Sequence, residues 1–167
     1  MRRLEGARRR QADRLLSIVA AALVGSSCAT AGNRPRAEPT FARSPDAALR
    51  ALPFSEAVRV GELLYLSGQI GTRPGTLELV PGGIMNETRQ TLENVRGILV
   101  RNSSSLERVV KCTVFLADMA EWQAMNEVYV EFFPNHPPAR SALGTSGLAL
   151  GARVEIECIA VVARDGE

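Results

Sequence analysis

The sequence predicts a mixed α/β (α+β) domain in which two helices cover one face of a single sheet. Short β-prone runs alternate with two stretches of helical periodicity, in the order ββαβαββ. The final β-prone run is apolar on both of its sides, which is typical of a strand buried on both faces. The length of 167 residues fits one such domain preceded by a tail.

The strands are predicted from runs of β-branched and apolar residues. Two of these runs, SEAVRV and LLYLSGQI, are joined around Gly61 and Glu62, which indicates a hairpin. Three further runs predict the remaining strands: VVKCTVFLAD, RSALGTS and ARVEIECIAVVA.

The helices are predicted from apolar residues that recur at helical spacing. The first helix covers about residues 84–101, and the second follows Asp118, a residue type that caps helix N-termini. Pro134 ends the second helix, because proline cannot continue a helix interior. The two stripes consist of Ile84, Thr88, Leu92, Val95, Ile98 and Leu99, and of Trp122, Met125, Val128, Tyr129 and Phe132.

Two helices can cover only one face of a sheet, whereas the last strand is apolar on both sides. Because no further helix is predicted, a second copy of the chain must cover the other face. The sequence therefore predicts a homo-oligomer and leaves its copy number open. The alternating side chains are Ile156, Cys158, Ala160 and Val162 on one side, and Ile159 and Val161 on the other.

The basic character of the chain is confined to its N-terminal part. The formal net charge is +2, yet residues 1–52 hold ten arginines and four acidic residues. The remaining residues hold ten basic and fourteen acidic side chains. A mildly acidic domain repels phosphate backbones, which argues against nucleic-acid binding.

Residues 1–31 have the pattern of a bacterial signal peptide, with an Arg-rich start, a short apolar run and small residues. Ala29-Thr30-Ala31 fits ordinary signal peptidase. Cys28 instead resembles the lipidated cysteine of a lipoprotein box, although Gly25 stands where such boxes carry Leu. Both interpretations predict an extracytoplasmic (periplasmic) protein, lipid-anchored to a membrane in the second case. The alternative is an unstructured basic leader on a cytoplasmic protein.

Residues 32–52 are rich in Pro, Arg and Ala and show no apolar periodicity. This composition predicts a disordered tether. The folded domain is accordingly expected to span residues 53–167.

The sequence shows no metal or nucleotide motif. His136 is the only histidine, and no Cys or His pair has metal-ligand spacing. Cys112 and Cys158 lie in apolar runs and are interpreted as small buried side chains. Whether they form a disulfide stays open, because sequence does not give their distance.

Arg140 and Glu155 are the candidate catalytic residues. Pro137 and Pro138 fix the backbone before Arg140, and a rigidly held guanidinium can grip a carboxylate through two hydrogen bonds. Glu155 is flanked by apolar residues, and a desolvated carboxylate has a raised pKa and can act as a base. At the ends of neighbouring strands, one residue would hold an anion and the other would activate water. The alternatives are a surface or interface salt bridge for Arg140 and an outward-facing strand residue for Glu155.

Four stretches resemble the Rid (YjgF-type) family of reactive intermediate deaminases, also called the endoribonuclease L-PSP family. They cover residues 53–163 almost without gaps. The stretches are PFSEAVRVGELLYLSGQIG, ETRQTLENVRGILV, VVKCTVFLADMAEWQAMNEVYVEFFPNHPPARSAL and GARVEIECIAVV. The resemblance implies a chorismate-mutase-like fold, a homotrimer with sites between subunits, and no metal or cofactor. The implied reaction is hydrolysis of 2-imino and enamine acids, such as 2-aminoacrylate, to 2-keto acids and ammonia.

The resemblance also assigns residues to the site. It implies that Arg140 binds the substrate carboxylate and that Glu155 activates the attacking water. The pocket positions that it implies are Ser67, Gly68, Asn126, Phe54 and Ala142. The last two depart from the family, which often has Tyr and Cys there.

Two other functions stay open. Loss of the Tyr and Cys groups favours a non-catalytic trimer of the same fold that binds a small carboxylate. A ribonuclease activity, attached to some relatives, is disfavoured by the acidic domain and by the lack of an acid–base pair for phosphoryl chemistry.

Overall fold

The computed structural model describes residues 37–163. The predicted signal peptide, with Cys28, lies outside the described residues. In the described part, no helix is long and apolar enough to cross a bilayer.

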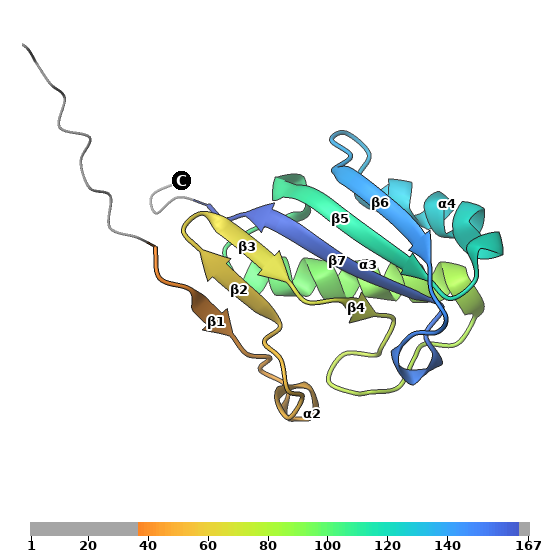
Figure 1. The fold of residues 1–167 in the computed structure, drawn as a ribbon, viewed down its shortest axis with the longest axis horizontal. Coiled ribbons are helices and arrows are strands. Elements are labelled where there is room, and N and C mark those ends of the chain that lie inside the picture. The colour runs from red at the N-terminus through yellow and green to blue at the C-terminus, as the bar shows by residue number, and fades with distance from the viewer. Residues whose placement is uncertain (1–36, 164–167) are drawn as a thin grey trace, which may run out of the picture. The chain divides into compact units, whose positions relative to one another are not determined.

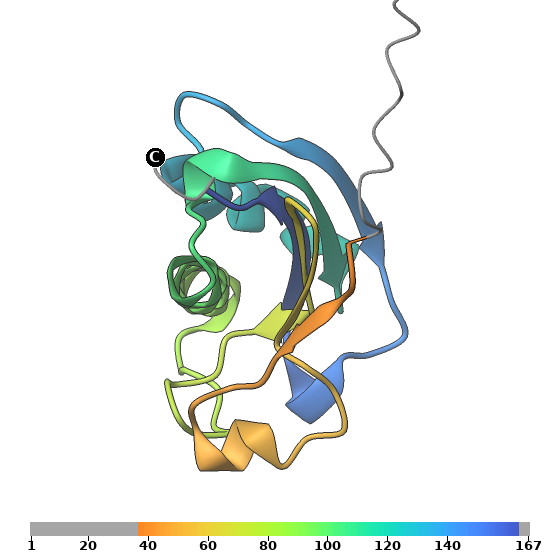
Figure 2. The same cartoon turned by 90° about the vertical axis from the view of Figure 1, so that its left-hand side faces the viewer.

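A mixed sheet carries two long helices on one of its faces (Figures 1 and 2). The strand order is β1-β2-β3-β7-β5-β6, and β4 pairs with β7 beyond the end of β3. Only β5 and β6 pair in parallel. The strands are β1 (Thr40–Ala42), β2 (Ala57–Val60), β3 (Leu63–Leu66), β4 (Gln69–Ile70), β5 (Val109–Leu116), β6 (Ala139–Gly144) and β7 (Val154–Val161), and the helices are α2 (Ala47–Arg50), α3 (Gly83–Arg101) and α4 (Trp122–Phe132). The predicted fold class is confirmed.

The helices α3 and α4 bury their apolar stripes against the sheet. In α3 every member of the predicted stripe is buried. In α4 the stripe is buried except at Trp122, which is exposed. Asp118 accepts a hydrogen bond from the backbone N–H of Ala120 (2.9 Å). It therefore caps the short turn Met119–Glu121 that leads into α4, rather than α4 itself.

A disordered tether was predicted for residues 32–52. This prediction is wrong for residues 40–42 and 47–50, which form a strand and a helix. Thr40–Ala42 pairs with β2, and Ala47–Arg50 forms a helical turn. Arg43 Nη2 donates to the carbonyl oxygens of Arg50 (2.6 Å) and Leu52 (3.3 Å), and Arg50 Nε donates to that of Ser44 (2.9 Å). The ordered structure of this segment could not be predicted from apolar periodicity, because it is held by hydrogen bonds from arginine side chains to main-chain carbonyls.

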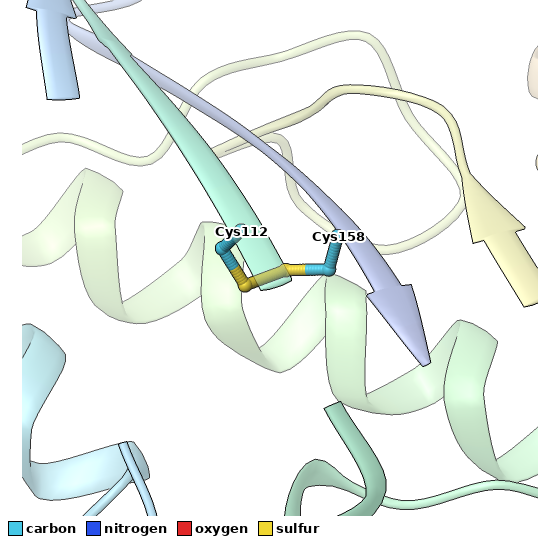
Figure 3. The surroundings of a disulfide bond; sticks show 2 residues. All are labelled: Cys112 and Cys158. Atoms are coloured by element: carbon cyan, nitrogen blue, oxygen red, sulfur yellow. A yellow bond between two sulfur atoms is a disulfide. The ribbon is translucent and has the colours of Figure 1, made fainter. Parts of the chain in front are cut away.

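A disulfide joins the two long central strands. Cys112 of β5 and Cys158 of β7 stand directly opposite each other and are linked through their sulfur atoms (Figure 3). Both residues are buried in the core, as predicted. The link could not be inferred from sequence, since the register between strands 46 residues apart was unknown.

Among residues 37–163, no helix covers the other face of the sheet (Figure 2). On β7 the residues of one side, such as Ile156, are buried, whereas Ile159 and Val161 on the other side are half-buried. On β3, Tyr65 and Leu63 expose 42% and 38% of their surface on this face. Apolar side chains therefore remain partly in contact with water, and the expected homo-oligomer stays a prediction.

Candidate active site

A cleft of about 560 Å³ opens where β3 ends and β4 begins. Glu155, Ser67, Gly68 and Phe54 line it, so four of the predicted site residues share one cavity. The predicted strand LLYLSGQI is in fact divided at Ser67 and Gly68 into β3 and β4. The residues at this division, Ser67 and Gly68, line the cleft together with Glu155.

Glu155 lies on β7 between the fully buried residues Val154 and Ile156. Because side chains alternate along a strand, Glu155 points to the face that carries no helix. Burial raises the pKa of its carboxyl group, and the like charge of Glu157 raises it further. A carboxylate with a raised pKa is a better proton acceptor, which suits a general base.

Gly68 leaves the space that the Glu155 side chain occupies. A Cβ atom at position 68 would overlap Oε1 of Glu155. The backbone here is held by side chains, because Ser67 Oγ donates to the carbonyl oxygen of Ser55 (2.7 Å). Gln69 Nε2 donates to the carbonyl oxygens of Ser67 (3.0 Å) and Gly68 (3.1 Å). The loop beside Glu155 is therefore fixed by its own hydrogen bonds.

Arg140 lies on β6 and points toward α4. Its Nη1 donates to Oδ1 of Asn126 (2.7 Å), and its guanidinium lies 4.6 Å from the centre of the Tyr129 ring. Asn126 thus accompanies Arg140 and not Glu155. Within residues 37–163, no carboxylate forms an ion pair with Arg140, so the salt-bridge alternative finds no partner there.

Ala142 follows two residues after Arg140 on the same strand. It pairs with Val114 of β5 and packs, partly buried, against the core. Its methyl group therefore serves packing, and only its backbone is available for polar contacts.

Tyr129 contacts the candidate residue Arg140, and the sequence indicated it only as part of the core. Its ring is buried beneath Arg140 and packs against Phe133. The centres of the Tyr129 and Phe133 rings are 4.8 Å apart. Burial raises the pKa of the phenol to about 12, against the opposing charge of Arg140, so Tyr129 is neutral at physiological pH. No sequence signal could show the stack, because it depends on β6 lying over α4.

Arg140 and Glu155 of one chain do not meet. The expectation of neighbouring strands is wrong, because β5 lies between β6 and β7. Arg140 pairs with Cys112 and Glu155 pairs with Phe115. The two residues are thus separated by two strand spacings across the sheet and three residues along it, each roughly 10 Å. They also point to opposite faces, so a site that uses both requires two copies of the chain.

The chain is an α+β domain whose sheet carries helices on one face, and a cleft large enough for a small-molecule ligand opens beside β3 and β4. The family model described as Endoribonuclease L-PSP matches residues 45–162, and the chain belongs to this family, which is the Rid or YjgF family. A relative from Mus musculus, named 2-iminobutanoate/2-iminopropanoate deaminase, is 45% identical over 109 residues. The match covers 65% of this chain and 81% of the relative.

Solved structures agree with the family. Yeast Mmf1 is 37% identical and superimposes with a TM-score of 0.71, over 75% of this chain and all of its own. TdcF of E. coli, whose structure contains bound serine, is 33% identical with a TM-score of 0.67, over 74% of this chain and 99% of its own.

Proposed function

We propose that the protein is a homotrimeric hydrolase that converts 2-imino acids, and their enamine tautomers, to 2-keto acids and ammonia. The observation that carries the proposal is Glu155, a carboxylate of raised pKa in a ligand-sized cleft. The 45% identity to a 2-iminobutanoate/2-iminopropanoate deaminase supports the reaction class. Each turnover consumes one water and replaces the C=N bond of the imine by C=O.

The reaction begins with orientation of the substrate. Arg140 of a second copy binds the substrate carboxylate through its planar fork, while Asn126 and Tyr129 hold that guanidinium in place. Holding the imine carbon beside Glu155 removes much of the entropic cost of bringing water and substrate together.

Glu155 then moves protons. The reacting form is the imine protonated on nitrogen. Glu155 takes a proton from water as the water oxygen bonds to the imine carbon, and the electron pair of the C=N bond passes to nitrogen. The resulting tetrahedral carbon carries OH and NH₂. Glu155 returns its proton to nitrogen, the C–N bond breaks, and ammonia leaves. The hydroxyl proton passes to Glu155 as the C=O bond forms, and Glu155 releases it to solvent.

A closed ring of copies fits the separated halves of the site. Arg140 lies on β6 at one edge of the sheet, and Glu155 lines a cleft beside β4 at another edge. Contact between two different edges is head-to-tail, and such contacts give equivalent sites when the ring closes. The trimer is the ring size that the family resemblance implies.

Ammonia release tests the proposed activity. An amino-acid oxidase with catalase generates the imine in situ, and ammonia and keto acid are followed with and without the protein. We expect the protein to accelerate hydrolysis beyond the spontaneous rate. Calorimetric binding of 2-keto acids without any acceleration would instead identify the non-catalytic carboxylate-binding trimer.

An exported location is part of the proposal. The leader composition supports it, and the disulfide between Cys112 and Cys158 adds support, because disulfides persist in oxidising compartments. Fractionation of cells that express the full chain tests it. A periplasmic or membrane fraction is expected, with Cys28→Ala releasing an anchored form, whereas a full-length cytoplasmic chain would refute export.

A further inference from the structure

We propose that the cleft selects 2-imino acids with large apolar side chains, branched or aromatic, over three-carbon ones. This inference rests on the proposed imine hydrolysis and assigns the specificity to Leu150 and to the wall formed by residues 44–52. Nothing in the reaction itself requires a large side chain, so we assign the selection to the walls of the cleft that this chain supplies beside Glu155.

The cleft is larger and more apolar than a three-carbon acid needs. Its volume of about 560 Å³ lies within the range of sites that enclose drug-sized ligands. Phe54 lines the cleft and is 47% exposed. The apolar side chains that line the cleft include Leu49, Leu52, Phe54, Ile70, Leu77 and Leu150.

Two long polar side chains of the cleft, Arg101 and Asn94, are already paired within the chain. Arg101 Nη2 lies 2.9 Å from Oε2 of Glu56, so its charge is compensated. Asn94 donates both of its amide hydrogens, to the carbonyl oxygens of Ile70 (3.0 Å) and Thr72 (2.9 Å). Apolar contact therefore remains the main means of recognising a substrate side chain. Arg73, exposed at the rim, is the cation that an acidic side chain would meet.

Leu150 is held in an unfavourable conformation at the mouth of the cleft. Its φ of 58° lies in the left-handed region, where a bulky side chain is disfavoured and glycine is at ease. Its side chain is nevertheless 55% exposed, so burial in the chain does not explain its presence. Unfavourable backbone conformations at a cleft are typical of ligand contacts.

The opposite wall is held rigidly. Leu49 and Leu52 belong to the segment that Arg43 and Arg50 fasten through main-chain carbonyls. The segment also closes on the loop across the cleft, because a Cβ at Gly75 would lie 3.4 Å from Oδ1 of Asp46. A fixed wall can discriminate by size, since it does not yield to a poorly fitting ligand.

The test compares imines of different side chains. Imines are generated in situ from alanine, leucine, phenylalanine and glutamate, and kcat/KM for ammonia release is measured for each. We expect the leucine and phenylalanine imines to exceed the alanine imine by about tenfold or more, which is the usual discrimination of an apolar pocket. Leu150→Gly should lower this ratio about tenfold without lowering Tm, because it removes the contact and relieves the backbone. The control Val100→Ser, an exposed apolar residue of α3 outside the cleft, should leave the ratio unchanged.

Several results would overturn the inference while leaving imine hydrolysis intact. They are equal or greater activity on the alanine imine, a preference for the glutamate imine, an unchanged ratio in Leu150→Gly, and dissociation of the oligomer by Leu150→Gly in light scattering. If no imine is hydrolysed, the proposed function fails, but the size preference of the cleft can still be measured by calorimetry with 2-keto acids. Tighter binding of 4-methyl-2-oxopentanoate than of pyruvate would support the size preference, and tighter binding of pyruvate would refute it.

Discussion

The chemistry of single residues depends here on how the chain holds them. Arg140 and Glu155 could be selected from sequence because proline-fixed backbone and apolar flanks are local features. The contacts that these two residues make could not be predicted from sequence. The stack of Arg140 on Tyr129 and the fit of Glu155 against Gly68 arise from strands that are distant in sequence. The sequence could thus propose Arg140 and Glu155 as candidates, but it could not give their geometry.

The Glu155→Gln variant separates binding from proton transfer. Glutamine keeps the shape of the side chain but cannot accept a proton, so ammonia release should fall by about 10²–10⁴-fold while 2-keto acid binding survives. In the parent, the acidic limb of the activity profile should lie above 4.5, since burial raises the pKa of Glu155 above that ordinary value. Full activity in the variant would remove Glu155 from the mechanism.

The raised pKa of Glu155 also predicts the pH dependence of stability. A carboxyl whose pKa is raised on folding binds its proton more tightly in the folded state, so ionisation at higher pH destabilises the protein. Glu155→Gln should therefore be more stable than the parent at pH 7, and the difference should fade as the pH falls toward 4.5. Thermal melts at both pH values measure it. A difference in Tm that does not change with pH would contradict the assignment.

Tyr129 positions Arg140 through its ring. The phenol oxygen has no hydrogen-bond partner among the described residues, so Tyr129→Phe should preserve keto acid binding. Tyr129→Leu should weaken that binding about tenfold through loss of the cation–π contact. In an Arg140→Ala background the leucine substitution should have no further effect. Additive losses in the double variant would show a general packing role instead.

At the scale of elements, periodicity predicted the helices and long strands well. The apolar stripes of α3 and α4 and the hairpin at Gly61 were visible because each is a local repeat. Periodicity did not predict the division of LLYLSGQI into β3 and β4. It also did not predict that Thr40–Ala42 forms a strand. Both depend on hydrogen bonds to distant partners, which a repeat in the sequence does not record.

The disulfide between β5 and β7 should contribute to stability. It closes a loop between positions 46 residues apart, which corresponds to about 4 kcal/mol in the chain-entropy account. The double variant Cys112→Ala, Cys158→Ala should lose stability of this order in denaturant titrations, and the reduced parent should behave similarly. Free thiols at Cys112 and Cys158 in the denatured, unreduced parent, located by alkylation and mass spectrometry to separate them from Cys28, would refute the link.

At the scale of the whole molecule, one chain holds the two proposed catalytic residues, Arg140 and Glu155, far apart. The open sheet face with Tyr65 and Ile159 and the edge cleft are both features that a neighbouring copy would cover. The sequence predicted this need from a strand apolar on both sides. It could not show that Arg140 and Glu155 face opposite sides of one sheet, because strand order was unknown.

Mixing two inactive variants tests the shared site most directly. Arg140→Ala and Glu155→Gln are each purified, dissociated, mixed in equal amounts and reassembled, with a trimer mass confirmed by light scattering. Sites built from one copy's Glu155 and the next copy's Arg140 should recover about a quarter of the parent ammonia-release rate, as random assortment in a ring gives. Recovery no greater than that of either variant reassembled alone would contradict a site formed between copies.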